Sequence, residues 1–141
     1  MSSEPSLTLA MTPFPYAIEA TAPLAKAREM MEAHDFHHLP VTDGDRLVGV
    51  VTQRDLLSAQ ASAQDVDHMK VADLDLSEAY VVSLHTPLNE VVHHMASTGL
   101  GATLVTRQGK LVGIVTVTDL ARLLAQLLDE HYGSPEGPEI A

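Results

Sequence analysis

The sequence contains no cysteine and few aromatic residues: it has two phenylalanines, three tyrosines and no tryptophan. Without cysteine the chain can form no disulfide bond, no thiol nucleophile and no cysteine-based zinc site. Hydrophobic residues make up 45% of the 141 residues and aromatic residues only 4%. We therefore expect a packed core that is mainly aliphatic, in one domain or in two very small ones.

Basic residues are also scarce. The chain has 8 Lys and Arg against 19 Asp and Glu, which gives a formal net charge of −11 with neutral histidines. Binding to nucleic acid or to an anionic membrane surface depends on Lys and Arg that neutralise phosphates, so neither partner is expected. An anionic ligand would have to be small and held locally by backbone N–H groups and one or two cations.

Long hydrophobic runs are missing as well. No apolar stretch approaches the roughly 18 residues that a membrane-spanning helix needs. Residues 1–18 have neither the basic start nor the apolar centre of a secretory signal. We therefore expect a cytoplasmic protein that makes no contact with membranes.

The clearest pattern that is present is an internal repeat. The segment LVGVVTQRDL at residues 47–56 returns as LVGIVTVTDL at residues 111–120. The alignment extends without a gap from Tyr16–Ser58 onto Tyr80–Arg122 and matches tyrosine, proline, methionine and glycine positions. Two copies of one supersecondary unit are the simplest interpretation.

Each copy shows the same order of local patterns. A short extended piece, Tyr16–Ile18 or Tyr80–Leu84, precedes a helix that opens at Pro23 or Pro87 and carries apolar residues at helical spacing. We expect Thr86 to cap the second of these helices. A hairpin with a glycine-containing turn follows, and a last helix begins at a Thr-x-x-Asp motif. Each unit is therefore predicted to be β-α-β-β-α.

These units suggest the domain boundaries. The prediction is an N-terminal extension over residues 1–10, a first repeat over 11–62, a linker over 63–74, a second repeat over 75–130 and a disordered tail over 131–141. One such unit is small for independent stability, so the two are expected to bury their apolar faces together.

The Thr-x-x-Asp motif has two interpretations. It is a capping box, in which the threonine accepts a hydrogen bond from the first helical turn and the acid reaches back. It also lies where a strand ends and a helix begins, and the free N–H groups of a helix start attract phosphate. The threonine hydroxyl can donate to a phosphate oxygen, and the aspartate can accept two hydrogen bonds from the cis-diol of a ribose. The motif therefore suits a nucleoside phosphate, although its spacing alone is only suggestive.

The whole set of motifs resembles a pair of CBS domains, the regulatory modules named after cystathionine β-synthase. The shared features are the helix-opening T/A-P-L, x-x-L-P-V, D-G-x-L-V-G and T-x-x-D-L, from about Met11 to Leu124. The resemblance implies an α/β (α+β) fold in which two β-α-β-β-α repeats pack about a pseudo-twofold axis. It also implies two clefts for adenosyl ligands, such as AMP, ADP, ATP or S-adenosylmethionine, whose binding regulates a partner protein, for instance as an energy sensor.

The resemblance assigns residues to both clefts. Each cleft joins the Thr-x-x-Asp of one repeat with the first strand and the helix-to-strand loop of the other. Cleft A would combine Val50, Thr52, Arg54 and Asp55 with Ala79, Tyr80, Val81, Gly101 and Ala102. Cleft B would combine Ile114, Thr116, Thr118 and Asp119 with Pro15, Tyr16, Ala17, His37 and His38.

The two clefts are not expected to be equivalent. Cleft A has Arg54, which could equally be a surface residue paired with an acid, whereas cleft B has Thr118 at that position. Cleft B instead faces His37 and His38, where a bound phosphate would raise the pKa of a histidine. We expect affinity in cleft B, but not in cleft A, to weaken between about pH 6 and 8.

Three classes of function remain open. The first is a ligand-binding regulatory module, and the second is a protein-interaction module whose clefts are vestigial. The third, an enzyme, is disfavoured because no nucleophile–base pair and no strong metal motif is found, so no catalytic residue, no metal site and no required cofactor are predicted.

A homodimer is expected, because the last helix carries a wider apolar stripe than so small a module can bury: Leu120, Leu123, Leu124, Leu127 and Leu128.

Overall fold

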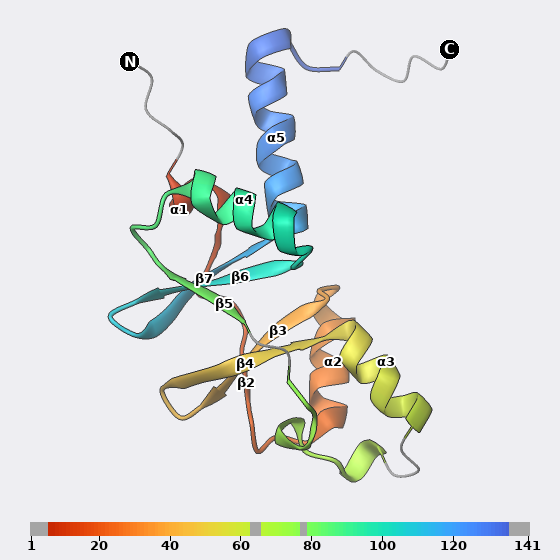
Figure 1. The fold of residues 1–141 in the computed structure, drawn as a ribbon. Helices are drawn as coiled ribbons and strands as arrows, with labels where there is room; N and C mark the ends of the chain where they lie inside the picture. Colours follow the sequence, from red (N-terminus) through yellow and green to blue (C-terminus); the bar gives the residue numbers. More distant parts are fainter. Residues whose placement is uncertain (1–5, 63–65, 77–78, 136–141) are drawn as a thin grey trace.

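The computed structural model describes residues 6–62, 66–76 and 79–135 as two halves that repeat the same order of elements (Figure 1). The first half contains β2 (Ile18–Glu19), α2 (Leu24–His34), β3 (His38–Asp43), β4 (Arg46–Thr52) and α3 (Gln53–Ser62). The second contains β5 (Tyr80–Ser83), α4 (Leu88–Thr98), β6 (Ala102–Arg107), β7 (Lys110–Thr116) and α5 (Val117–Tyr132). The predicted α+β class and the β-α-β-β-α order of each repeat are confirmed.

The two sheets have the same register. β2 runs parallel to β3 with Ile18 opposite Val41, and β5 runs parallel to β6 with Val82 opposite Val105. Each hairpin is antiparallel, and each has its bulge directly after that valine. The apolar sides of the strands pack on the helices of their own half, and β4 contacts β7 where the halves meet. The sequence repeat is thus a repeat of backbone geometry.

The helix ends differ from the expectation in detail. Thr86 is not the N-cap of α4: Pro87 holds that position without a side-chain hydrogen bond. The backbone N–H of Thr86 instead donates to the carbonyl of Ser83, because Thr86 belongs to the turn after β5. Gly99 ends α4 in the left-handed region, and Asp35 adopts the same conformation at the end of α2. The first extended piece is also shifted, since β2 starts only at Ile18.

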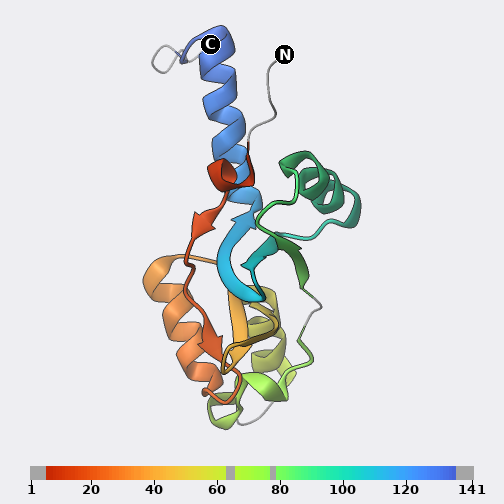
Figure 2. The same cartoon turned by 90° about the vertical axis from the view of Figure 1, so that its left-hand side faces the viewer.

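The segment before each repeat packs on the opposite half. α1 (Leu7–Ala10) lies beside α5, and β1 (Thr12–Pro13) pairs with β7 (Figures 1 and 2). Leu7 is buried in the core of the second half. In the same way Val71, in the 3₁₀ turn η2 (Val71–Asp73), is fully buried in the core of the first half. The two repeats therefore exchange their leading segments, and the predicted linker is part of a core.

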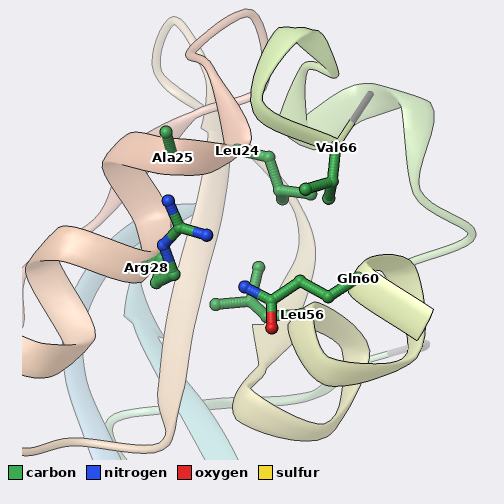
Figure 3. A pocket seen from close by; sticks show the side chains of 6 residues that line it. All are labelled: Leu24, Ala25, Arg28, Leu56, Gln60 and Val66. Carbon is green, nitrogen blue, oxygen red and sulfur yellow. The ribbon is translucent and has the colours of Figure 1, made fainter. Parts of the chain in front are cut away.

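A second 3₁₀ turn, η1 (Val66–His68), also lies on the first half. It closes a gap of only about 10 Å³ between α2 and α3 (Figure 3). Six side chains line the gap: Leu24, Ala25, Arg28, Leu56, Gln60 and Val66. A space of this size is no larger than one water molecule, so the first half is tightly packed here.

Helix α5 extends well beyond the core that its first turns cover, and Figure 2 shows it standing out from the body of the molecule. Leu123 is buried, whereas Leu124, Leu127 and Leu128 are exposed. Of the described helices, none combines the length and the apolar character that crossing a bilayer requires. The exposed leucines therefore form an apolar stripe on the part of α5 that extends beyond the core.

The exchange of leading segments predicts that Leu7→Ala destabilises the whole protein. Removing a buried leucine side chain costs about 2–5 kcal/mol, through lost burial and the cavity that remains. The matched control is Leu9→Ala in the same helix, because Leu9 is 67% exposed and its loss should cost at most about 0.5 kcal/mol. Urea unfolding followed by circular dichroism measures both. Equal stabilities of the two variants would contradict the buried role of α1.

Candidate functional site

Both Thr-x-x-Asp motifs form capping boxes at helix starts. The backbone N–H of Thr52 donates to Asp55 Oδ2 at 2.9 Å, and the N–H of Asp55 donates to Thr52 Oγ1 at 3.1 Å. The same two bonds join Thr116 and Asp119 at 2.9 and 3.2 Å. The motif therefore fixes the local backbone of α3 and α5, whatever else it binds.

A large cleft of about 690 Å³ lies between the two halves at the second of these motifs. Its walls include eight residues predicted for cleft B: Pro15, Tyr16, His37, His38, Ile114, Thr116, Thr118 and Asp119. The ninth, Ala17, is exposed and does not line the cleft. The structure thus brings together, from both halves, nearly all the residues that the sequence assigned to cleft B.

The residues predicted for cleft A are placed differently. Thr52 and Asp55 cap α3, preceded by the buried Val50, while Arg54 and Val81 are exposed. The ring of Tyr80 stacks on His94 at 3.7 Å. Ala79 precedes β5, and Ala102 pairs with Thr116 at the start of β6. Gly101 lines cleft B. Cleft A therefore stays a prediction.

Asp119 is the most highly connected group of cleft B. Its side chain is only 8% exposed, and both carboxylate oxygens accept hydrogen bonds. Oδ2 accepts from the backbone N–H and the hydroxyl of Thr116, each at 2.9 Å. Oδ1 accepts from the Thr12 hydroxyl at 3.2 Å and from Arg122 Nη1 at 3.3 Å. The carboxylate therefore joins β1, the end of β7 and the first turn of α5.

Two of these partners were missed by the sequence analysis. Arg122 could have been found, since residues three apart on a helix are neighbours and Arg122 follows Asp119 by that spacing. Thr12 lies 107 residues from Asp119, and no local pattern relates the two. Cleft B has Thr118 where the first repeat has Arg54, and Arg122 supplies a cation to this cleft from the next turn of the helix.

An aromatic wall forms one side of cleft B. It contains Phe14, Tyr16 and Phe36, which include both phenylalanines of the chain, and the imidazole of His34. The rings of Tyr16, His34 and Phe36 stack as a cluster, in which the ring centre of His34 lies 4.2 Å from Tyr16 and 5.4 Å from Phe36, and Tyr16 lies 6.0 Å from Phe36. Phe14 is 80% exposed and has a φ of 45°, a conformation that is rare for a bulky residue. An exposed wall of flat rings is suited to stacking on a planar group of a ligand.

His38 lies at the boundary between the halves. A Cβ atom added to Gly101 would be only 2.6 Å from His38 Nε2, so the imidazole occupies the space that a larger residue at this position would need. Burial lowers the pKa of His38 from its ordinary value, the neighbouring His37 lowers it further, and Asp55 on α3 acts in the opposite direction. His38 is therefore neutral at pH 7 and contacts both halves in that form. A bound phosphate would raise the pKa of a nearby histidine, whereas the protein itself lowers the pKa of His38.

Comparison with known proteins identifies relatives of the whole arrangement. A family profile described as CBS domain matches residues 7–62 and 71–126. Hypoxic response protein 1 of Mycobacterium tuberculosis is 31% identical over 105 residues, which cover 73% of this chain and 73% of that protein.

Two solved structures share the fold. A Vibrio cholerae protein assigned to acetoin utilization (AcuB) is 29% identical with a TM-score of 0.83, over 95% of this chain and 100% of that one. CBSX2 in complex with AMP is 28% identical with a TM-score of 0.71, over 83% of this chain and 93% of that one. Both matches extend across the two halves described above.

The environment of His38 predicts how stability depends on pH. Because the folded state lowers its pKa, the unfolded chain binds a proton more readily, so the free energy of unfolding should fall as pH drops below about 6.5. The loss should level off once pH lies below the pKa of the folded state.

His38→Gln should make this fall shallower, with the same substitution at the exposed His93 as the control. Urea titrations at several pH values between 7.5 and 5 measure the slope. If the free energy of unfolding depends on pH equally in the His38→Gln variant and in the wild type, groups other than His38 cause the dependence.

Proposed function

The chain belongs to the CBS domain family and carries two copies of the domain, and we propose that it is a regulatory module that binds an adenosyl nucleotide. The candidate ligands are AMP, ADP, ATP and S-adenosylmethionine. The observation that carries the proposal is cleft B, where the Thr-x-x-Asp motif of one repeat faces the entry segment of the other. Its volume of about 690 Å³ lies within the range of small-molecule sites.

The chemistry of the cleft supports a nucleotide in particular. The start of α5 offers backbone N–H groups and a positive dipole end for an anion, beside Thr116 and Thr118. Asp119 can accept hydrogen bonds from ribose hydroxyls once one of its four present donors is displaced. The aromatic wall can stack on the base, a contact that contributes about 1–3 kcal/mol in nucleic-acid complexes. CBSX2, which shares the fold, was solved in complex with AMP.

We propose a regulatory rather than a catalytic role. Asp119 is held by four hydrogen bonds to the protein, an arrangement suited to rigid recognition more than to proton transfer. A ligand in cleft B contacts both halves at once, so its binding would favour one relative arrangement of them. A cytoplasmic partner protein would sense that arrangement.

The alternative is an interaction module with vestigial clefts. The saturated hydrogen bonding of Asp119 favours it, because a diol must displace groups that the protein already supplies. The apolar stripe on α5 also favours it, since exposed apolar surface of this kind usually binds another protein. The two functions differ in whether an adenosyl compound stabilises the fold.

We also propose that the chain forms a homodimer through this stripe. The exposed apolar residues of α5 lie along one side of the helix: Val117, Leu124, Leu127, Leu128 and Tyr132. A second copy could cover such a surface symmetrically.

A melting-temperature screen tests ligand binding. An adenosyl ligand at 100 times its dissociation constant should stabilise the fold by about 2.7 kcal/mol, or roughly 9 °C for a chain of this length. Asp119→Ala should abolish the part of the shift that arises in cleft B, and Asp55→Ala the part that arises in cleft A. Inorganic phosphate alone is the control. If no adenosyl compound shifts the melting temperature at millimolar concentration, the interaction module becomes the better description.

Sedimentation at micromolar concentration tests the dimer. The protein should have twice the mass of a 15.1 kDa chain, and Leu124→Glu should convert it to monomers by placing a charge in the apolar stripe. Gln126→Glu, on the polar side of the same helix, should leave the dimer intact. A monomeric wild-type protein would refute the proposal.

A further inference from the structure

The carboxylate of Asp119 has no free acceptor site for a ligand. An ionised carboxylate offers about four lone-pair positions, and four donors already occupy those of Asp119. Two come from Thr116, one from Thr12 and one from Arg122. If a ribose diol is to bind Asp119, at least one of these donors must leave.

Arg122 is the donor that can leave most easily. The two bonds from Thr116 belong to the capping box and are held by the start of α5, and the Thr12 hydroxyl is held by the pairing of β1 with β7. The Arg122 side chain, in contrast, is 73% exposed, and within the described part of the chain it makes one bond, of 3.3 Å to Oδ1. An ion pair with so exposed a partner contributes little stability, so its rupture costs little.

We propose that ligand binding exchanges the partner of Arg122: the ribose hydroxyls take its place on Asp119, and the released guanidinium binds the 5′-phosphate. This inference rests on the proposed nucleotide site and restricts the class of adenosyl ligand that the site binds. Cleft B selects 5′-phosphorylated adenosines over adenosine, which lacks the anion, and over S-adenosylmethionine, which carries a positive sulfonium at the 5′ position.

The charge distribution around the cleft supports this role for Arg122. Among the described residues that line cleft B, Arg122 is the only Lys or Arg, in a chain with a formal net charge of −11. Its guanidinium is charged at every accessible pH and can donate two parallel hydrogen bonds to a phosphate. His38 lines the same cleft but is largely neutral at pH 7, because burial lowers its pKa.

The proposal also accounts for a difference between the repeats. In the alignment of the two copies, the position of Arg122 is occupied in the first repeat by Ser58. A serine at this position cannot release a cation toward a ligand of Asp55. Selection for phosphate through this exchange is therefore a property of cleft B alone.

Calorimetric titration of AMP, adenosine and S-adenosylmethionine tests the exchange. Each titration uses a protein with Asp55→Ala, so that cleft A does not contribute. AMP should bind at least about tenfold more tightly than adenosine, the ratio that about 1.4 kcal/mol of charge-assisted hydrogen bonding gives. Adding Arg122→Gln should bring this ratio close to one without weakening adenosine. Arg107→Gln, which removes the same charge from the exposed turn after β6, should leave the ratio unchanged.

Two results would overturn the inference in different ways. The first result is that AMP still binds more tightly than adenosine in the Arg122→Gln protein, or that S-adenosylmethionine binds the Asp55→Ala protein more tightly than AMP does. Either outcome would show that Arg122 does not select phosphate, while the proposed nucleotide site would stand. If none of the three compounds binds, the proposed function fails and this inference fails with it.

Discussion

The fold depends on the exchange of leading segments between the two repeats. Leu7 is buried in the core of the second half, and Val71 is fully buried in the core of the first, so each core is completed by the segment that leads into the opposite repeat. Neither core is complete without the other repeat. The two small units therefore fold as one body, which overcomes the marginal stability expected for a single β-α-β-β-α unit.

The same exchange builds the candidate site. The chain that leaves α1 pairs antiparallel with β7 and then crosses to β2, so Thr12 lies beside Asp119 while Phe14 and Tyr16 line the same cleft. This path brings the Thr12 hydroxyl to Asp119 and places the aromatic wall opposite the capping box. A ligand in cleft B would consequently contact the segment that holds the halves together, which gives binding a direct route to the rest of the molecule.

The repeated framework does not make the surroundings of the two Thr-x-x-Asp motifs identical. Strand pairing and bulges repeat from one half to the other, but the side chains at matching positions differ in size and charge. His37 matches Gly101, and the space beside that glycine is occupied by the imidazole of His38. Arg122 matches Ser58, so the first repeat has no arginine at the position from which Arg122 donates to Asp119. The framework therefore repeats, while the side chains around the two motifs differ.

The resemblance to CBS domains assigned residues to cleft B, but the sequence by itself determined the repeat, the order of elements and both capping boxes. These features follow from spacing within a few residues, or from a repeated pattern, and both can be read along the chain. Only the tertiary structure decided that the supposed linker contributes Val71 to a core, that Pro87 rather than Thr86 caps α4, and that Thr12 binds Asp119 across 107 residues. It also decided that Phe14, Tyr16, His34 and Phe36 gather on one wall. Such contacts depend on which surfaces pack together, and no local periodicity specifies that choice.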